Sequence, residues 1–306
     1  MWKFMKINYK IESLKIKEVN RIFHDEEANF YDQRHPEIFK EQNNWQKFCQ
    51  EYLKQLPRPA VLLDTGTGTG FVPSILAQYL THQDKIICTD ISSKMLDRAK
   101  EKLEKFSCQF EFIETDCEKI SLVDSSIDLI TVNSTLHHLP DYHNFLKEVD
   151  RLLKPKGMFC IMHEPNRRFF NNPLLFFLFR SLSYIFSKFK KHKQSHKSDL
   201  FEIVSERLLK KRITLNKLTA QEIQPLVDIH SPTASSKINK KAGFDPFLLK
   251  KKYFSNYTLL SVYTYNHLGK FDSNKNLFLK YLDKLFLFLF PKSGSSFCLI
   301  LKKTVQ

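Results

Sequence analysis

Continuous apolar runs alternate with helical-period segments between residues 59 and 163. Runs without polar alternation are typical of strands buried on both faces of a sheet. Between them, apolar residues three and four positions apart predict amphipathic helices. Because strands and helices alternate, we expect a parallel, doubly wound α/β sheet with right-handed crossovers. The predicted strands are 60–64, 85–90, 109–116, 127–133 and 158–164, and the predicted helices are 71–80, 93–106 and 142–153.

Two further strand-like runs near the C-terminus extend this sheet. Residues 253–265 (YFSNYTLLSVYTY) predict a sixth strand, and residues 296–303 (SFCLILKK) predict a last strand that pairs with it. The pair would form an antiparallel edge on an otherwise parallel sheet, which gives seven strands in total.

A large helical insertion, residues 166–252, separates the fifth predicted strand from the sixth. Asn172 and Pro173 are suited to cap a Phe-rich helix over 171–189. An Asp199/Glu202 capping box predicts an amphipathic helix over 199–212. The remaining polar stretches, 190–197 and 230–246, are expected to be loops.

Three of the seven glycines lie in one short segment, LLDTGTGTGF (62–71), directly after the first predicted strand. Glycine permits close approach to the backbone, and doubly wound sheets bind ligands at the carboxyl ends of their strands. A dinucleotide fingerprint would need Gly or Ala at position 71, where this chain has Phe71. The loop therefore does not predict a nicotinamide cofactor.

The segment Asp64-x-Gly66-x-Gly68-x-Gly70 resembles motif I of class I S-adenosylmethionine-dependent methyltransferases. Further segments with the same resemblance follow in the family's order: DISSKMLDRAK, ETDCEKI, SSIDLITVNSTLHHL and LKEVDRLLKPKGMF. Upstream, FHDEEANFYD (23–32) resembles the lid of the small-molecule and quinone-type subgroup (methyltransferase type 11-like), with His24 in place of the usual aspartate. The resemblance covers residues 23–165 and implies a Rossmann-like fold.

This resemblance implies S-adenosyl-L-methionine as the cofactor, a helical lid over residues 1–55, and a core of residues 56–165 and 253–306. The bare glycine backbone would make room for the methionine arm, and Asp90 would accept hydrogen bonds from both ribose hydroxyls. Asp116 would contact the adenine amino group. Gly70 could instead serve only packing between elements, and Met95 could be a core residue. The implied cofactor residues are Tyr31, Asp64, Gly66, Thr67, Gly68, Gly70, Asp90, Ile91, Met95, Asp116, Cys117 and Asn133.

Three residues are candidates for the chemistry at the methyl group. His137 and His138 could act as a general base, because imidazole titrates near neutral pH, or could serve to pack and orient. Glu164 ends the fifth predicted strand beside His163 and could contact the acceptor or cap the following helix. No spacing typical of a metal site is present, and methyl transfer mainly requires alignment, so a metal-ion mechanism is not expected.

Positive charge is concentrated in the insertion. Residues 166–252 carry 19 Lys or Arg and 6 Asp or Glu, a net charge of +13 within a chain total of +15. The lysines could be a solvated face, could attract an anionic membrane that presents a lipid-like acceptor, or could bind RNA. The RNA alternative is disfavoured because NSTL stands where base-amine methyltransferases have N/D-P-P-Y. A regulatory protein that binds the cofactor without turnover is a further alternative.

The six cysteines occur singly, which favours reduced thiols over a disulfide framework. The first 20 residues lack the pattern of a signal peptide, and no apolar run approaches 18 residues. We therefore expect a cytoplasmic methyltransferase, with peripheral contact to the inner membrane face as a further expectation. Its predicted acceptor is a small or lipid-like molecule methylated at oxygen or carbon, and the sequence leaves its oligomeric state open.

Overall fold

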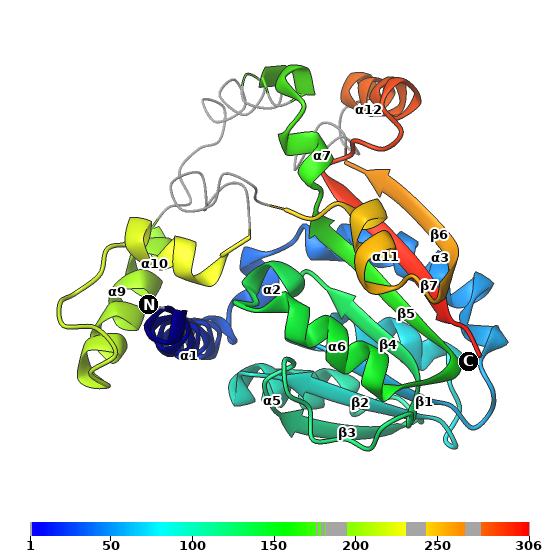
Figure 1. The fold of residues 1–306 in the computed structure, drawn as a ribbon, viewed down its shortest axis with the longest axis horizontal. Helices are drawn as coiled ribbons and strands as arrows, with labels where there is room; N and C mark the ends of the chain where they lie inside the picture. Colours follow the sequence, from blue (N-terminus) through cyan, green and yellow to red (C-terminus); the bar gives the residue numbers. More distant parts are fainter. Residues whose placement is uncertain are drawn as a thin grey trace.

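A single seven-stranded sheet forms the centre of the molecule (Figure 1). A computed structural model describes residues 2–175, 177, 178, 181, 195–230, 243–266 and 277–305. The strand order is β3-β2-β1-β4-β5-β7-β6. The first five strands run parallel, and β7 lies antiparallel between β5 and β6. The strands are β1 (Val61–Thr65), β2 (Lys85–Asp90), β3 (Gln109–Glu114), β4 (Ile127–Asn133), β5 (Leu153–Pro165), β6 (Tyr257–Tyr265) and β7 (Ser296–Lys303).

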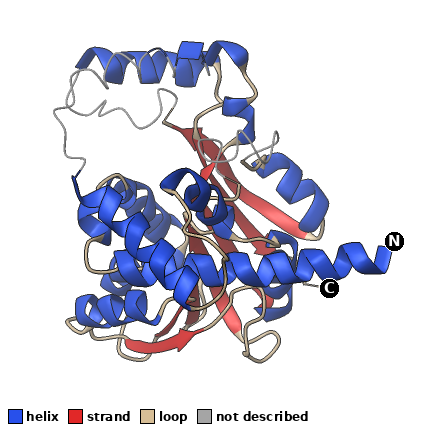
Figure 2. Cartoon of the chain, turned by 90° about the vertical axis from the view of Figure 1, so that its left-hand side faces the viewer, coloured by secondary structure: helices blue, strands red, loops and turns tan. Residues whose placement is uncertain are grey.

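Helices cover both faces of this sheet and extend beyond its ends (Figure 2). On one face, α3, α4 and α5 pack on alternate strand residues such as Leu62 and Ile86. On the other face, α6 and α11 pack on the intervening residues, such as Leu63 and Ile87. The described helices are α1 (Trp2–Glu27), α2 (Tyr31–Arg34), α3 (Gln42–Glu51), α4 (Phe71–Leu76), α5 (Ser93–Leu103), α6 (Tyr142–Leu152), α7 (Arg167–Phe170), α9 (Ser195–Lys210), α10 (Ala220–Val227), α11 (Pro246–Tyr253) and α12 (Leu277–Leu289).

A third hydrophobic cluster joins the N-terminal helix to the insertion. Val19, Ile22 and Phe23 of α1 pack against α9 and α10, whose cluster residues include Val204 and Ile223. Figure 1 shows these three helices together at one side of the sheet. The apolar faces of α9 and α10 are therefore packed against α1, while their basic residues remain outside this cluster.

The predicted fold class is confirmed, and several boundaries are reproduced. β2, β4 and β7 have the predicted bounds, whereas β5 begins five residues earlier than predicted and β6 begins four residues later. The late start of β6 has a local cause, because α11 extends to Tyr253 and a turn follows it. The antiparallel pairing of the last two strands is as predicted.

The insertion departs further from its prediction. Helix α9 begins at Ser195, so Asp199 lies inside the helix and the predicted Asp199/Glu202 capping box is wrong. A capping box is present instead at Thr219 and Glu222, at the start of α10. The Asn172 side chain does accept hydrogen bonds from the backbone amides of Leu174 and Leu175, as its predicted capping role requires. Most of the rest of the predicted 171–189 helix, and the greater parts of the loops 190–197 and 230–246, lie outside the described residues.

All six cysteines lie in the described part of the chain, where they are buried and form no disulfide. Of the helices described, none has both the length and the apolar character needed to cross a membrane.

Candidate active site

A cavity opens at the carboxyl ends of β1, β2 and β4. This is the edge where the strand order reverses, because β1 pairs with β2 on one side and with β4 on the other. We call this space the cofactor cavity. Its lining includes most of the predicted cofactor residues: Tyr31, Gly66, Gly68, Asp90, Ile91, Met95, Asp116, Cys117 and Asn133. Lys17, Asn20, His24, Ser134, Thr135 and His138 also contribute to it.

The glycines of the loop after β1 are required for different reasons. Gly66 has a φ of +67°, and a Cβ there would lie 2.2 Å from Oγ1 of Thr135, so the neighbouring β4 loop fills the space at this position. Gly68 has a φ of +54°, and a Cβ there would meet no atom within 4 Å. Gly68 therefore borders open cavity, whereas the close approach at Gly66 comes from the protein itself.

Gly70 does not line the cofactor cavity. A Cβ at Gly70 would lie 3.2 Å from Cα and Cβ of Ala99, which places this glycine in the contact between α4 and α5. The prediction that Gly70 contacts the cofactor is therefore corrected to the packing alternative.

Asp90 closes β2 and ties the glycine loop to the next helix. Its Oδ2 accepts a hydrogen bond from the Gly68 amide at 2.8 Å, and its Oδ1 accepts one from the Ser92 amide at 2.9 Å. Burial raises the pKa of Asp90 to about 6, although these backbone amides favour the charged form. Each carboxylate oxygen retains a further lone pair, so Asp90 can still accept from a ligand hydroxyl in the cavity.

Asp64 lies beneath the loop, in the wall of a smaller adjoining cavity that also includes Thr67 and Asn133. Its oxygens accept from the hydroxyls of Thr67 at 2.9 Å and Thr131 at 2.6 Å. Burial raises the pKa of Asp64 to about 7. Asp64 and Thr67 thus hold the loop in shape, and neither borders the larger cavity.

A lysine from the N-terminal helix reaches the opposite end of the cofactor cavity. Nζ of Lys17 lies 2.5 Å from Oδ2 of Asp116 and also contacts Glu118. Lys17 could not be found from the sequence, because α1 is distant in the chain and carries no motif at this position. Its contact shows that Asp116, the carboxylate predicted to bind adenine, is held by α1.

Next to the cofactor cavity lies a second space, which we call the histidine chamber. The two spaces share His24, Tyr31, Ser134 and His138 as lining residues. Other chamber residues come from α1, η1 (Ile38–Glu41), β5, α9 and α10, so the N-terminal helices and the insertion together close it. The polar side chains that line it are His24, Glu27, Tyr31, His35, Glu37, Ser134, His137, His138, His163, Gln224 and Asp228.

His24 and His138 are uncharged at neutral pH. Burial lowers the pKa of His24 to about 3, and burial together with the neighbouring His137 lowers the pKa of His138 to about 4. Nδ1 of His138 lies 2.8 Å from the backbone carbonyl of Val227, which can only accept, so this nitrogen carries the proton. Nε2 of His138 is then the nitrogen with a lone pair.

Glu164 has neither of its predicted roles. It is fully buried, and Oε1 accepts from the backbone amides of Thr135 at 2.6 Å and Leu136 at 2.7 Å. Oε2 lies 2.9 Å from Nδ1 of His137. The cap of the following helix is Asn166, whose side chain accepts from the Arg168 amide. Glu164 therefore positions the β4 loop and His137, and it lines neither cavity.

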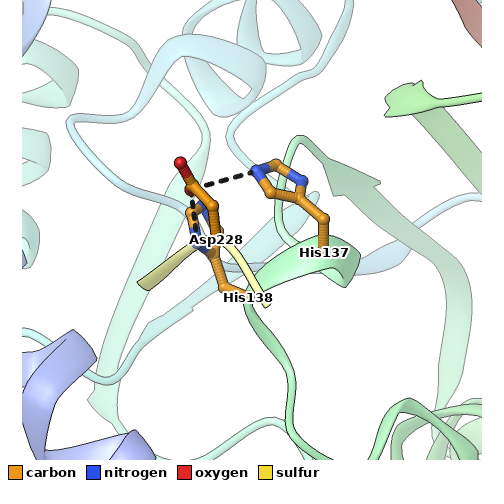
Figure 3. Close-up of side chains that lie close together, drawn as sticks. All are labelled: His137, His138 and Asp228. Carbon is orange, nitrogen blue, oxygen red and sulfur yellow. Dashed lines mark ion pairs between the residues drawn. The ribbon is translucent and has the colours of Figure 1, made fainter. Parts of the chain in front are cut away.

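Asp228 completes a cluster that could not be found from the sequence. Figure 3 shows its carboxylate facing the imidazoles of His137 and His138. Oδ1 of Asp228 lies 3.8 Å from Nε2 of His137 and 3.4 Å from Nδ1 of His138. Burial disfavours its charged form, but the two histidines hold the pKa of Asp228 below its usual value. No sequence pattern connects Asp228, at the end of α10, with residues 137 and 138.

His35 is the charged histidine of the chamber wall. Burial opposes its protonation, but hydrogen bonds to Glu27 and Glu37 raise the pKa of His35 to about 9. Its Nε2 lies 3.1 Å from Oε1 of Glu27. The imidazolium of His35 thus offsets part of the negative charge on this side of the chamber.

Several known proteins that are similar to this chain are methyltransferases. A model of the methyltransferase domain family matches residues 63–161. The demethylmenaquinone methyltransferase of Bacillus licheniformis is 32% identical over 160 residues, which cover 52% of this chain and 68% of that protein. A ubiquinone/menaquinone biosynthesis C-methyltransferase of Geotalea daltonii is 30% identical over 157 residues, covering 49% of this chain and 66% of that protein. A crystal structure of a SAM-dependent methyltransferase from Aquifex aeolicus is 29% identical, with a TM-score of 0.35, and the match covers 39% of this chain and 64% of that one.

Proposed function

Because the chain belongs to the class I S-adenosylmethionine-dependent methyltransferases, we propose that it methylates a small acceptor that enters the histidine chamber. The acceptor carries an ionisable hydroxyl, of the phenol or enol type, and receives the methyl group at carbon or oxygen. The observation that carries this proposal is the shared wall of the two spaces, formed by His24, Tyr31, Ser134 and His138. An acceptor in the chamber would meet the cofactor at this wall.

The residues of the cofactor cavity fit S-adenosyl-L-methionine. Gly68 leaves open space beside the loop, and the carboxylates of Asp90 and Asp116 provide hydrogen-bond acceptors at separate points of the cavity wall. When bound, this cofactor supplies a methyl group activated on a sulfonium. The protein's task is then to orient the acceptor and to accept its hydroxyl proton.

Two imidazoles can perform that task. Nε2 of His138 has a lone pair and can accept a hydrogen bond from the acceptor hydroxyl at the shared wall. A pKa of about 4 makes His138 a weak base, so its first role is orientation. His137 lies between the carboxylates of Glu164 and Asp228, which stabilise a proton taken up by its ring. In the reaction, the acceptor's O–H proton would pass to the ring of His137, and the bound cofactor would supply the methyl group to the acceptor's oxygen or carbon. Transfer to a ring carbon would also release that carbon's proton.

The related enzymes support an acceptor of the quinone class and transfer to carbon. One relative is named for demethylmenaquinone and the other for C-methylation in ubiquinone and menaquinone biosynthesis. The chamber has apolar as well as polar walls, from Phe23, Leu200 and Phe201. An aromatic ring with hydroxyl groups would satisfy both kinds of wall.

We extend this proposal to a lipid-like acceptor reached from an anionic membrane surface. Helix α12 exposes Phe278, Tyr281, Leu285 and Phe288 along one helical stripe, and Phe177 is exposed after α7. Lys284 and Lys292 are exposed within or beside this helix. Because β5 and β6 run parallel to each other, α7 and α12 follow the same edge of the sheet as the cofactor cavity (Figure 1). Apolar side chains with a basic rim are typical of peripheral membrane contact.

The chamber can be tested even while the identity of the acceptor is open. Cell extract is incubated with the protein and methyl-labelled cofactor, and the products are separated into lipid, small-molecule, RNA and protein fractions. We expect label in the lipid or small-molecule fraction. Label in RNA would favour the nucleic-acid alternative, and cofactor binding without any labelled product would favour a regulatory role.

A matched pair of variants ties the labelled product to the chamber. Gln224 lines the chamber, whereas Gln221, one turn earlier on α10, is exposed. Gln224→Trp should reduce labelling at least tenfold by narrowing the chamber, with the calorimetric affinity for the cofactor unchanged. Gln221→Trp should leave both quantities unchanged. Equal labelling by the two variants would show that the acceptor does not enter here.

A further inference from the structure

Three side chains at the floor of the histidine chamber present ligand atoms to one point. His137 and His138 come from η4 (Leu136–His138), and Asp228 comes from the end of α10. One ligand atom from each of these residues lies within 4.8 Å of the other two. Oδ1 of Asp228 is 3.8 Å from Nε2 of His137 and 3.4 Å from Nδ1 of His138 (Figure 3). Two imidazoles and one carboxylate, gathered in this way, form a donor set that first-row divalent cations prefer.

The surroundings of this cluster orient it as metal ligands are usually oriented. Nδ1 of His137 is held by Oε2 of Glu164 at 2.9 Å, which directs the opposite nitrogen, Nε2, toward Asp228. The other oxygen of Asp228 accepts a hydrogen bond from the side chain of Gln224. A carboxylate behind a ligating histidine is the common second partner in metal sites, where it fixes the ring and increases its basicity.

The charges of the side chains around the cluster are also compatible with a bound cation. Glu164 is fully buried and Asp228 lies in the chamber wall, so two carboxylates flank the two imidazoles. His35, a positive side chain of the chamber wall, is already engaged by Glu27 and Glu37. Glu164 is already bound by two backbone amides and His137, so Asp228 is the carboxylate that a cation at this point would face.

We propose that His137, His138 and Asp228 form a binding site for a divalent first-row cation such as Zn²⁺, Mn²⁺ or Fe²⁺. Metal–ligand bonds of about 2.0–2.2 Å place neighbouring donor atoms roughly 3.0–3.6 Å apart, so small side-chain movements close the site. The Val227 carbonyl, 2.8 Å from Nδ1 of His138, is a further oxygen donor at the same point. Coordination through this nitrogen requires the neutral ring to change tautomer, so that its proton moves from Nδ1 to Nε2.

The site goes beyond the proposed methyl transfer and does not depend on it. With a cation bound, His137 and His138 would be ligands, and the cation would take over their role toward the acceptor oxygen. Remaining coordination positions would face the chamber, where an acceptor oxygen could occupy one of them. A cation there would hold a hydroxyl or carbonyl group of the acceptor and favour its deprotonated form. Cation binding is measured without acceptor or turnover, so an absence of methyl transfer would leave the proposed cation site standing. An absence of cation binding would likewise leave the proposed methyl transfer standing.

Calorimetry with the full chain, free of any affinity tag and dialysed against a chelator, provides the test. We expect Zn²⁺ and Mn²⁺ to bind saturably with one site per chain, and Co²⁺ bound in the same site to show visible absorption that Zn²⁺ removes. Asp228→Asn, which preserves side-chain volume, and His137→Ala should each weaken Zn²⁺ binding at least about 30-fold. Glu164→Gln should weaken it about 10–100-fold through the ring of His137.

Two controls keep the result interpretable. His82→Ala removes an exposed histidine far from the cluster in the chain and should bind Zn²⁺ as the unmodified protein does. Each variant must also bind S-adenosylmethionine with unchanged affinity, which establishes that it is folded. The proposal is overturned if the unmodified protein binds no divalent cation below about 100 μM, or if Asp228→Asn binds as tightly as the unmodified protein.

Discussion

Replacement of Glu164 by Gln would test how the loop after β4 is held at the junction of the two cavities. In the protein, one carboxylate oxygen accepts from two backbone amides, at 2.6 and 2.7 Å, and the other faces Nδ1 of His137 at 2.9 Å. A Gln amide can retain the first two hydrogen bonds through its oxygen. Its NH₂ group, however, would meet the N–H of His137, so two donors would face each other.

The expected loss of stability follows from these contacts. A hydrogen bond to a charged partner contributes about 1.5–3 kcal/mol. Glu164→Gln removes the bond to His137 and weakens the two bonds from backbone amides, because the acceptor loses its charge. It also removes the cost of burying that charge, so we expect the free energy of unfolding to fall by about 2 kcal/mol. Glu164→Ala leaves all three donors without this acceptor and should cost about 4 kcal/mol or more. Thermal midpoints should therefore fall in the order unmodified, Gln, Ala.

Urea and thermal denaturation at pH 7.5, with calorimetric cofactor titration, would measure these effects. Affinity for S-adenosylmethionine should change less than about threefold in Glu164→Gln, because Glu164 lines neither cavity. Labelling of the acceptor should fall at least tenfold, because His137 loses its fixed orientation. Glu101→Gln, at an exposed carboxylate paired with Arg98, is the control and should cost under about 0.5 kcal/mol. Equal stability and labelling of Glu164→Gln and the unmodified protein would refute the reasoning.

Three further predictions address the cofactor, the lid and the membrane surface. Burial raises the pKa of Asp90 to about 6, so the cofactor affinity of the unmodified protein should be constant above pH 7 and fall as the pH drops through 6. Asp90→Asn should bind the cofactor weakly, with little pH dependence between pH 5 and 8. Calorimetry that shows equal affinity of the unmodified protein at pH 5 and 8 would contradict this. His35 has a pKa raised to about 9, so its stabilisation is complete below pH 6.5 and is lost as the pH rises through 9. His35→Gln should therefore cost about 1–2 kcal/mol at pH 6 and almost nothing at pH 10, and a cost independent of pH in urea denaturation would exclude this account. The protein should co-sediment with anionic vesicles, and less of it should do so in high salt or with neutral vesicles. The double variant Phe177→Ser/Phe288→Ser should remain in the supernatant. Equal co-sedimentation of the double variant and the unmodified protein would show that these exposed rings do not contact the membrane.

The choice of phenylalanines for the vesicle experiment depends on the structure. From the sequence alone, Phe177 would be paired with Phe176, because both fall in the predicted 171–189 helix. The side chain of Phe176 lies outside the described residues, whereas Phe177 is 68% exposed. Phe177 is therefore not a core residue in the described structure. Phe288, on α12, takes the place of Phe176 because it is 83% exposed.

The sheet and the cofactor cavity could be predicted from the sequence because their signals are local. A buried strand such as β4 is a continuous apolar run, and the next strand along the chain, β5, begins within 30 residues and pairs with it. Asp90 could be placed at the cavity because a residue that ends a parallel strand lies at the edge where ligands bind. The roles of individual loop residues were harder to predict. Gly66 and Gly70 look alike in sequence, but one is packed by Thr135 and the other by Ala99.

The histidine chamber could not be predicted, because its walls meet only through tertiary packing. Asp228 and His137 are far apart in the chain, and their contact depends on how α10 packs on α1. Helix α10 also carries a low-specificity pattern, an apolar stripe that many surface helices share. Glu164 was misassigned for a related reason. A carboxylate at the end of a strand can face the ligand or the next loop, and only the position of Thr135 determines which of these occurs here.

The loop after β4 connects the two halves of the proposed reaction. Thr135 packs under Gly66 and so supports the glycine loop on the cofactor side. Two residues later, His137 is fixed by Glu164 and faces Asp228 on the chamber side. Because the same buried carboxylate holds both Thr135 and His137, the glycine loop and the chamber floor share one support. An insertion that supplies Asp228 can therefore change the acceptor chemistry at the chamber floor while the strand ends that hold the cofactor stay the same.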